Sequence, residues 1–336
     1  MRDFILIGNE NSKRTRYLRQ AADPAACRFS CIDHGELYCR FDEFITEWKT
    51  TNPIIKIDPP EFQNSNISRF FLDDEAFGKY FDLLRLLGQL KFTFLNSPGM
   101  ILLTLDKEKT KRILMEHSVP ATGLIGADYH SAEEILSLPE PNIFIKPKSG
   151  SGASGVFALR KSRRSGKFCL YTSSRLSRDG LVNTKRIYKI ENIEEIEKYL
   201  NAIVPLPHVV ERWIPKDTFR GYAYDLRVVF QFGNVDYIVP RLSKSPITNL
   251  HLNNHAVLYG DLHLENKVRE DIEELCVNAM KYFPGLNSAG IDILLTKNKK
   301  PMIIEINGQG DLIHQDIYNG NTIYKNQLKG IINGST

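Results

Sequence analysis

A loop rich in glycine and serine follows a short apolar segment near the middle of the sequence. Residues 146–156 read Lys-Pro-Lys-Ser-Gly-Ser-Gly-Ala-Ser-Gly-Val, directly after an apolar run at 143–145. Such a loop can bring backbone N–H groups close to phosphate oxygens, while its lysines supply positive charge. It has neither the Walker A spacing nor the Rossmann glycine pattern. Taken alone, it is equally compatible with a flexible surface loop.

Three oxygen-bearing side chains lie on two adjacent strand candidates near the C-terminus. Asp292 belongs to the segment 291–295, and Glu305 and Asn307 belong to the segment that follows the lysine-rich turn 297–300. Glu305 and Asn307 are two residues apart, so they share one face of a strand and can converge with Asp292. Hard oxygen ligands suit Mg²⁺, whose coordination is completed by water and substrate phosphates. The alternative is that they are simply polar residues on the solvent face.

An acid and an arginine alternate with apolar residues in the segment 224–229. Asp225 and Arg227 therefore face the same side of a predicted strand. The fork of donors on an arginine can contact a polyphosphate. The alternative is a salt bridge within the strand, which contributes little to stability.

The sequence also predicts the elements that position these residues. In the first hundred residues, apolar runs predict strands and one segment with helical spacing lies between two of them; the strands are at 4–7, 54–57 and 92–96, and the helix is at 77–90. A small α/β domain is therefore expected at the N-terminus.

The rest of the chain is predicted to be richer in β-structure. Asp106 can cap a helix that Val119-Pro120 closes. Residues 226–239 turn at Gly233-Asn234 and read as a β-hairpin. Further elements are expected as strands at 143–146 and 209–214 and as an amphipathic helix at 267–282.

Composition excludes several classes of protein. The 336 residues hold 44 Lys plus Arg against 40 Asp plus Glu, a balance that does not indicate nucleic acid as the main ligand. The first residues lack the apolar core of a secretory signal, and no segment approaches the roughly 18 apolar residues of a membrane span. Five scattered cysteines without a Cys-x-x-Cys pair indicate a reducing cytoplasm. The clustered Cys27, Cys31 and Cys39 are expected to be buried and structural, with metal or redox chemistry as the alternative.

The order and spacing of these pieces, from about residue 104 to 310, resemble the ATP-grasp superfamily. The likeness is greatest to the branch that contains glutathione synthetase and the ribosomal-protein glutamate ligases. It is carried by eight blocks in the family's order: Asp106-Lys107 with Val119-Pro120-Ala121-Thr122, Phe144-Ile145-Lys146-Pro147, Val210-Glu211-Arg212-Trp213-Ile214, Asp225-Leu226-Arg227-Val228, Pro240-Arg241, Thr248-Asn249-Leu250-His251, Ala289-Gly290-Ile291-Asp292 and Ile304-Glu305-Ile306-Asn307-Gly308.

The resemblance implies a mixed α/β (α+β) fold in two parts. A small α/β domain that precedes the ATP-grasp unit would span residues 1–103. The ATP-grasp domain would span residues 104–330, with a mobile lid at roughly 120–208. Many relatives of this kind are dimers or tetramers, so a homo-oligomer is left open.

The resemblance also implies roles for individual residues. Arg227 and Arg241 would be catalytic, and Asp292, Glu305 and Asn307 would hold Mg²⁺, with Mn²⁺ as an alternative. Lys109 and Lys111 are close enough to Lys107 to compete for its role. The expected ATP-binding residues are Lys107, Lys146, Lys148, Ser149, Gly150, Ser151, Gly152, Ser154, Gly155, Glu211, Arg212, Trp213, Ile214 and Asp225.

The implied activity is ligation of a carboxylate to an amine or a thiol through an acyl phosphate. The carboxylate could belong to an amino acid, a small metabolite or a peptide. The alternatives are a small-molecule kinase on the same scaffold and a non-catalytic ATP-binding module. The acceptor would approach near Arg241, His251, His255, Asp311 or His314, where the sequence departs from the family at Asn253-Asn254 and lacks a common proline after Asn307.

The stretch 160–189 is rich in lysine and arginine. It is interpreted as the solvated face of the lid. The alternative is a surface that attracts an acidic peptide or a phosphorylated substrate.

Overall fold

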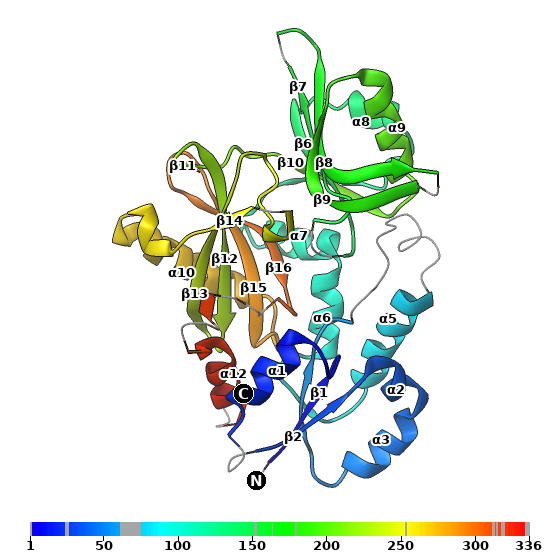
Figure 1. Ribbon diagram of the computed structural model, residues 1–336, viewed down its shortest axis with the longest axis vertical. Helices are drawn as coiled ribbons and strands as arrows, with labels where there is room; N and C mark the ends of the chain where they lie inside the picture. The colour runs from blue at the N-terminus through cyan, green and yellow to red at the C-terminus, as the bar shows by residue number, and fades with distance from the viewer. Residues whose placement is uncertain are drawn as a thin grey trace.

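The computed structural model describes residues 2–23, 27–60, 75–150, 153–162, 164–178, 180–252, 254–310, 313, 315–316 and 320–332. Three β-sheets follow one another along the long axis of the molecule (Figure 1), each with helices packed against it. The predicted mixed α/β fold is confirmed. Within these ranges no helix is both long enough and apolar enough to cross a membrane.

The N-terminal sheet is parallel, with the strand order β2-β1-β3-β4 (β2, Cys27–Ile32; β1, Arg2–Ile7; β3, Ile54–Ile57; β4, Thr93–Phe94). β1 and β3 are short apolar runs buried between helices, as expected for parallel strands. The surrounding helices are α1 (Lys13–Ala21), α2 (His34–Cys39), α3 (Phe41–Trp48) and α5 (Glu75–Leu87).

This sheet confirms the strands predicted at 4–7 and 54–57 and shortens the third to two residues. Strand β2 was not predicted, although it contains two of the clustered cysteines. The prediction that all three of these cysteines are buried holds for Cys27 alone, because Cys31 is half-buried and Cys39, at the end of α2, is exposed.

The second sheet is antiparallel, with the order β5-β10-β6-β7-β8-β9, and is called the lid sheet below. Its strands are β5 (Leu124–Ala127), β10 (His208–Arg212), β6 (Asn142–Pro147), β7 (Phe157–Lys161), β8 (Phe168–Ser177) and β9 (Gly180–Ile190). Helices α8 (Ala132–Leu136) and α9 (Ile193–Ile203) cover one face and share an apolar core with it. The basic stretch 160–189 contributes the long hairpin β8–β9.

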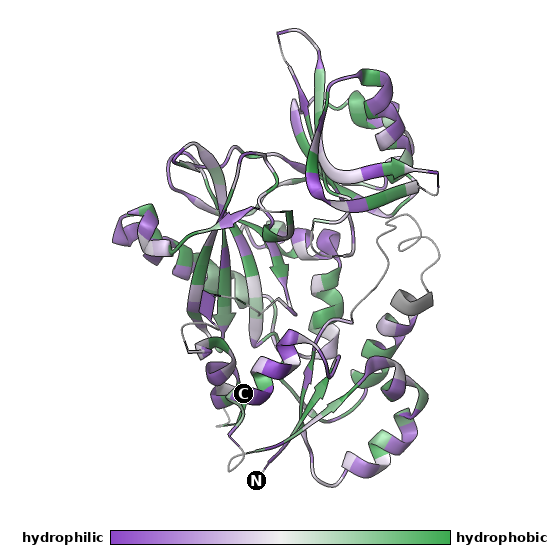
Figure 2. Ribbon diagram, in the orientation of Figure 1, coloured by the Kyte–Doolittle hydropathy of each residue, from purple (hydrophilic) through white to green (hydrophobic). Residues whose placement is uncertain are grey.

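The third sheet, called the central sheet, has the order β14-β13-β12-β15-β16, with β11 paired to β12. Its strands are β14 (His255–Ala256), β13 (Asn234–Ser243), β12 (Tyr222–Gln231), β15 (Ser288–Leu295), β16 (Pro301–Asn307) and β11 (Thr218–Phe219). The helices α7 (Lys107–Glu116) and α10 (Asn266–Met280) contribute to its apolar core. Figure 2 shows these strands as mostly hydrophobic. Both predicted hairpins and the Asp106 cap of α7 are confirmed.

Two short 3₁₀ turns, Leu250–Leu252 and Tyr259–Leu262, lie in the connection that follows β13. Helix α6 (Pro98–Leu105) leads from the N-terminal sheet into α7, and helix α12 (Thr322–Ile332) returns to pack beside α1. The sequence-based boundary at 103/104 falls inside α6. The domain limits and the mobility of the lid remain predictions.

Asn96 joins the N-terminal sheet to the central sheet. Its side-chain amide donates to the carbonyl oxygens of Ser288 at 2.7 Å and Gly308 at 2.6 Å, and its oxygen accepts from the Ser288 N–H at 2.8 Å. All three bonds are buried, so their backbone partners have no access to water. Because Gly308 directly follows Asn307, this contact also fixes the end of β16.

Replacing Asn96 by alanine is expected to lower the free energy of unfolding by about 3 kcal/mol, because it orphans three buried backbone groups. Urea denaturation would measure the change. Asn298→Ala, in the exposed turn between β15 and β16, is the matched control and should change stability by less than about 0.5 kcal/mol. Equal stability of the two variants would contradict a structural role for Asn96.

Candidate functional site

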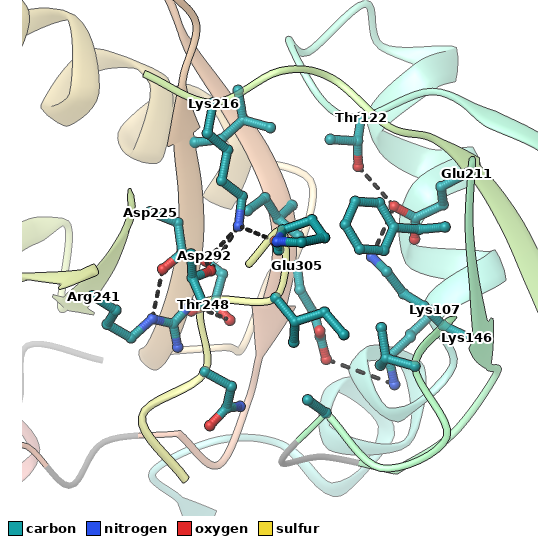
Figure 3. A pocket seen from close by; sticks show the side chains of 18 of the residues that line it. Lys107, Thr122, Lys146, Glu211, Lys216, Asp225, Arg241, Thr248, Asp292 and Glu305 are labelled. Carbon is teal, nitrogen blue, oxygen red and sulfur yellow. Dashed lines mark hydrogen bonds and ion pairs between the residues drawn. The ribbon is translucent and has the colours of Figure 1, made fainter. Parts of the chain in front are cut away.

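A cleft lies between the lid sheet and the central sheet (Figure 3). Its empty space, with the open mouth included, is about 910 Å³. The lid side is formed by β6, β10 and the glycine-serine loop. The central side is formed by β12, β13, β15, β16 and the loop after β13, and α7 closes one end.

Glu211, at the end of β10, is the centre of a buried charge cluster. Its Oε2 lies 3.0 Å from Lys146 Nζ and 3.5 Å from Lys111 Nζ, and it accepts a 2.8 Å hydrogen bond from the Thr122 hydroxyl. Burial opposes ionisation, but the two lysines lower the pKa of Glu211 to about 2. Burial lowers the pKa of Lys111 to about 8 despite the neighbouring carboxylate. The cluster links the lid strands β6 and β10 to helix α7.

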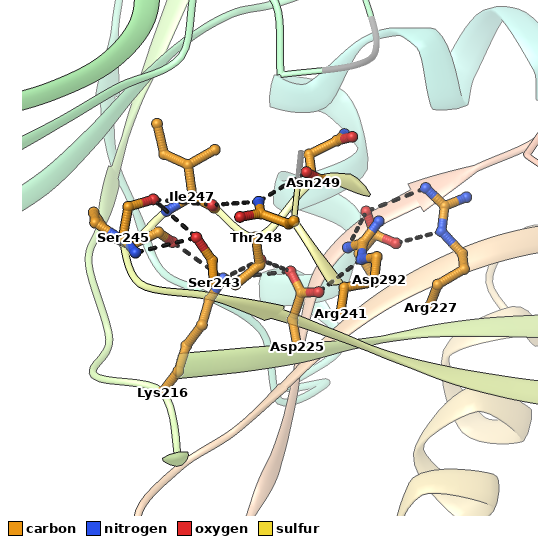
Figure 4. A network of polar contacts seen from close by, with 12 residues as sticks. Lys216, Asp225, Arg227, Arg241, Ser243, Ser245, Ile247, Thr248, Asn249 and Asp292 are labelled. Carbon is orange, nitrogen blue, oxygen red and sulfur yellow. Dashed lines mark hydrogen bonds and ion pairs between the residues drawn. The ribbon is translucent and has the colours of Figure 1, made fainter. Parts of the chain in front are cut away.

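A row of alternating charges crosses the central sheet (Figure 4). Asp225 on β12 faces Arg241 on β13 in register, and Arg227 on β12 faces Asp292 on β15. Arg241 Nε lies 2.7 Å from Asp225, and its Nη2 lies 3.2 Å from Asp292. Arg227 Nε lies 2.6 Å from Asp292. Each carboxylate therefore contacts a cation on a neighbouring strand.

Burial of these groups is offset by their pairing. Burial opposes ionisation of Asp225, but Arg241 and Lys216 hold its pKa below the usual range. Burial likewise opposes the charge of Arg241, but the carboxylates of Asp225 and Asp292 raise its pKa. Asp225 and Arg241 thus keep their charges across the neutral pH range.

Lys216 fixes the loop after β13 against this row. Its ammonium donates to the Thr248 hydroxyl at 2.6 Å and to the Pro246 carbonyl at 3.3 Å, and it lies 3.3 Å from Asp225. Burial lowers the pKa of Lys216. The loop therefore forms a wall of the cleft and brings Asn249 to its lining.

Lys107 and the glycine-serine loop meet at the other end of the cleft. Lys107 Nζ donates to the Gly150 carbonyl at 2.7 Å and lies 3.7 Å from Glu305 Oε1. The Lys107 backbone N–H donates to the Lys148 carbonyl at 2.9 Å. Helix α7 is thereby attached to the loop, which is suited to hold an anion between the loop and the metal candidates.

The part of the cleft beside Glu211 is apolar. Phe144, Val156, Ile214 and Leu294 are among its lining residues. The second carboxylate oxygen of Glu211, Oε1, is buried and has no hydrogen-bond partner in the described part of the chain. A flat ring with an N–H donor would satisfy this oxygen and bury its faces against the apolar side chains.

The comparisons with known proteins identify the family. A family model described as YheC/D like ATP-grasp matches residues 102–329, which is more than half of the chain. The chain belongs to the YheC/D-like ATP-grasp family. The superfamily predicted from the sequence motifs is therefore confirmed, and with it an ATP-grasp ligase whose cofactors are ATP and Mg²⁺. The narrower likeness to the glutathione synthetase branch remains a prediction.

Solved structures of ATP-grasp enzymes cover nearly all of this chain. One is D-alanine–D-alanine ligase from Bacillus anthracis with ATP, at 13% identity, 100% of this chain, 97% of that chain and TM-score 0.59. Another is the macrocyclase MdnC with its precursor peptide from Microcystis aeruginosa MRC. It is 13% identical, the match covers 99% of this chain and 100% of that chain, and the TM-score is 0.61. A third is a RiPP-associated ATP-grasp ligase from Chryseobacterium gregarium with ADP and peptides. It is 12% identical, the match covers 100% of this chain and 98% of that chain, and the TM-score is 0.62. At these identities the likeness shows the fold alone.

A search of curated proteins found no match.

The residues expected to hold Mg²⁺ in this ATP-grasp protein lie on adjacent strands. Asp292 pairs in register with Glu305, and Asn307 pairs with Gly290, two residues before Asp292. Within the described ranges, no group of three His, Cys, Asp or Glu side chains could hold a metal ion. Two carboxylates and one amide nevertheless fit Mg²⁺ when phosphate oxygens complete its coordination, as is common for this cation.

The charge of the lining agrees with this arrangement. Among the described residues that line the cleft, six side chains are cationic and four are anionic, a formal excess of two positive charges; they are Lys107, Lys146, Arg212, Lys216, Arg227 and Arg241, and Glu211, Asp225, Asp292 and Glu305. Fully ionised ATP with one Mg²⁺ carries two negative charges. The cleft and the metal nucleotide would therefore neutralise one another.

Most of the site residues expected from the sequence line this one cleft: Lys107, Lys146, Gly150, Ser154, Glu211, Arg212, Ile214, Asp225, Arg227, Arg241, Asp292, Glu305 and Asn307. Ser149, Gly155 and Trp213 are not among the lining residues; the Trp213 ring packs at 5.4 Å from Phe144 and under the Arg160 guanidinium. Ser151, Gly152, Asp311 and His314 lie outside the described residues, as does the His251 side chain.

Two of the sequence-based expectations need correction. Lys148 is not among the lining residues, and its ammonium forms ion pairs with Glu108 at 2.7 Å and with Asp128. His255 is exposed on β14 and packs edge-on against Tyr222 at 6.4 Å, away from the lining. Neither side chain is retained as a site residue.

Several polar residues of the site were not assigned a role from the sequence. Thr122, Lys216 and Thr248 line the cleft, and Lys111, named from the sequence as an alternative to Lys107, lies 3.5 Å from Glu211. The spacing of four between Lys107 and Lys111 on one helix face was the available signal for Lys111. Lys216 carried no signal, because its partners Pro246 and Thr248 are 30 and 32 residues away in the sequence.

Lys111→Met is expected to change how stability depends on pH. Because the folded pKa of Lys111 is about 8, the unfolded state binds more protons above that pH, and the wild-type free energy of unfolding gains about 2 kcal/mol between pH 8 and 9.5 from this group. The variant lacks this gain. Urea denaturation across this range, with the exposed Lys109→Met as control, would measure it; parallel curves for Lys111→Met and wild type would contradict the assignment.

Proposed function

We propose that this chain is an ADP-forming ligase that activates a substrate carboxylate with ATP and transfers the acyl group to an amine, with a thiol as the less favoured acceptor. The observation that carries the proposal is the row of Arg227, Asp292, Arg241 and Asp225 in the same cleft as Lys107 and Lys146. In this row the carboxylate of Asp292, the proposed metal ligand, lies between the guanidinium groups of Arg227 and Arg241. Such a site stabilises negative charge that develops between a nucleotide and a second substrate.

The cleft supports one orientation of ATP. Adenine would lie at the apolar end, with its amino group donating to Glu211. The phosphates would lie toward Lys107, Lys146 and the glycine-serine loop, whose backbone N–H groups bind anions. Mg²⁺, held by Asp292, Glu305 and Asn307, would neutralise phosphate charge.

The reaction follows from this placement. An oxygen of the substrate carboxylate attacks the γ-phosphorus, the bond to the β-phosphate oxygen breaks, and ADP leaves. The acceptor amine then adds to the acyl carbon, and phosphate departs with its carboxylate-derived oxygen. Arg227 and Arg241 would bind the transferred phosphoryl group, and the lid would exclude water that hydrolyses the acyl phosphate.

The substrate class is proposed from the fold neighbours. One of them is named as a ligase of D-alanine, one is bound with its precursor peptide, and one is in complex with a leader and core peptide. We therefore propose an amino acid or the side chain of a peptide as the carboxylate or the acceptor.

The five cysteines are free thiols, which supports a reducing compartment.

Product analysis tests the proposed function. The purified protein would be incubated with Mg²⁺-ATP and pools of amino acids, short peptides or cell extract, and ADP, phosphate and product masses would be followed. Ligation predicts a product lighter by one water than its two components, together with free phosphate. A product heavier by one phosphoryl group, without free phosphate, would identify a kinase instead.

Glu305→Gln is expected to reduce Mg²⁺-dependent ADP release at least 100-fold, because it removes one of the two carboxylate ligands from the metal site. Asp292→Asn is expected to do the same. Glu273→Gln, on α10, is the control: it changes the net charge by the same amount as Glu305→Gln but lies outside the cleft. A steady-state coupled ADP assay would measure all three, and wild-type rates in Glu305→Gln would overturn the metal assignment.

A further inference from the structure

Ala153 in the glycine-serine loop has a strained backbone. Its φ is +62°, in the left-handed region of backbone conformation that residues other than glycine rarely adopt. Such a conformation costs about 1–3 kcal/mol and persists only where the surroundings enforce it. Ala153 and the adjacent Ser154 both line the cleft. Contacts from the surrounding structure must therefore keep the Ala153 backbone in this conformation.

A buried polar patch of the β8–β9 hairpin makes the contacts that hold it. The Ser173 hydroxyl lies 3.0 Å from the Ala153 carbonyl oxygen, to which it donates, and 3.2 Å from Asn183 Oδ1. Asn183 Nδ2 donates to the Ser154 hydroxyl at 3.0 Å. Two consecutive loop residues are thus bound by two neighbouring strands of the lid sheet.

The hairpin is built to place these groups. The register of β8 against β9 shifts between Thr172 and Ser174, and the residues from Thr172 to Ser174 are all fully buried. A bulge of this kind changes the direction of a side chain, because it interrupts the regular alternation along the strand. Here it accompanies the contact of the Ser173 hydroxyl with the loop. The Thr184 hydroxyl donates to the Ser173 carbonyl at 2.8 Å and fixes the bulge.

Three hydroxyl residues in a row are a poor choice for the inside of a sheet unless they have partners. Apolar residues would pack there at lower cost. Of the three, Ser173 is the one whose hydroxyl bonds to a loop residue beside the cleft. The Thr172 hydroxyl accepts from the Ser174 N–H, and Ser174 Oγ has no hydrogen-bond partner among the described residues. Ser173 therefore serves the loop rather than the sheet.

We propose that Asn183, together with Ser173, is a positioning residue that holds Ala153 and Ser154 in the conformation that receives the phosphate tail of the nucleotide. This inference rests on the proposed function, which places the phosphates at this loop. Asn183 acts through Ser154 and does not touch the nucleotide. Its loss therefore weakens binding of the tail and leaves binding of the base and ribose unchanged.

The test compares two nucleotides that differ in their phosphates. AMP and AMPPNP with Mg²⁺ would be titrated by calorimetry into wild type, Asn183→Ala and Ser173→Ala, either of which suffices if the other fails to fold. AMPPNP affinity is expected to fall about tenfold, as for one lost buried hydrogen bond, while AMP affinity stays within twofold of wild type. Asn192→Ala removes the cap of α9 in the same lid and should bind both nucleotides as wild type does.

A double-mutant cycle tests the route through Ser154. If Asn183 acts on that hydroxyl, Asn183→Ala combined with Ser154→Ala weakens AMPPNP binding no more than the weaker-binding single variant. Unchanged AMPPNP affinity in Asn183→Ala, or an equal loss for AMP, would overturn the inference. A wild-type protein that does not prefer AMPPNP to AMP would instead refute the proposed function, on which the inference depends.

Discussion

The rest of the site depends on the buried row of charges that crosses the central sheet. Asp225, Arg227, Arg241 and Asp292 are placed beside one another by the register of three antiparallel strands. Removing one member of a buried charge pair costs about 3–5 kcal/mol, because the remaining charge loses its partner. The row is therefore specified as a unit, and the sheet that carries it has to be rigid. The apolar core beneath it, with α7 and α10, supplies that rigidity.

The lid joins this platform through two different kinds of contact. At the base end, Glu211 binds Lys146 from its own sheet and Lys111 from α7, so one buried carboxylate fixes a strand to a helix. Farther out, an apolar cluster that includes Trp213 and Tyr171 packs the lid sheet against Ile247 and Leu252 of the loop after β13. The end of the cleft where a base is expected therefore combines the buried Glu211 with apolar side chains such as Phe144 and Leu294.

Local patterns in the sequence were sufficient for much of this account. The hairpin at 226–239 and the pair Glu305 and Asn307 were predictable, because alternation and turn residues fix which side chains share a face. Strand β2 and the hydroxyl patch at Ser173 were not, since their burial is decided by partners far away in sequence. Gln309 illustrates the same limit: its amide donates to the Ile57 carbonyl on β3 and to the Tyr80 hydroxyl on α5, which are 252 and 229 residues away in the sequence. Lys148 lies outside the cleft lining, and its carboxylate partners Glu108 and Asp128 could not be predicted from the sequence.

The central claim is that a carboxylate is activated by phosphorylation in this cleft. The most direct measurement uses pooled amino acids and peptides whose carboxylates carry ¹⁸O, with mass spectrometry of the phosphate released from ATP. The account predicts that released phosphate contains one ¹⁸O for each ligated product, because the carboxylate oxygen leaves with the phosphoryl group. Product formation with unlabelled phosphate, or transfer of the phosphoryl group to a hydroxyl without phosphate release, would contradict it.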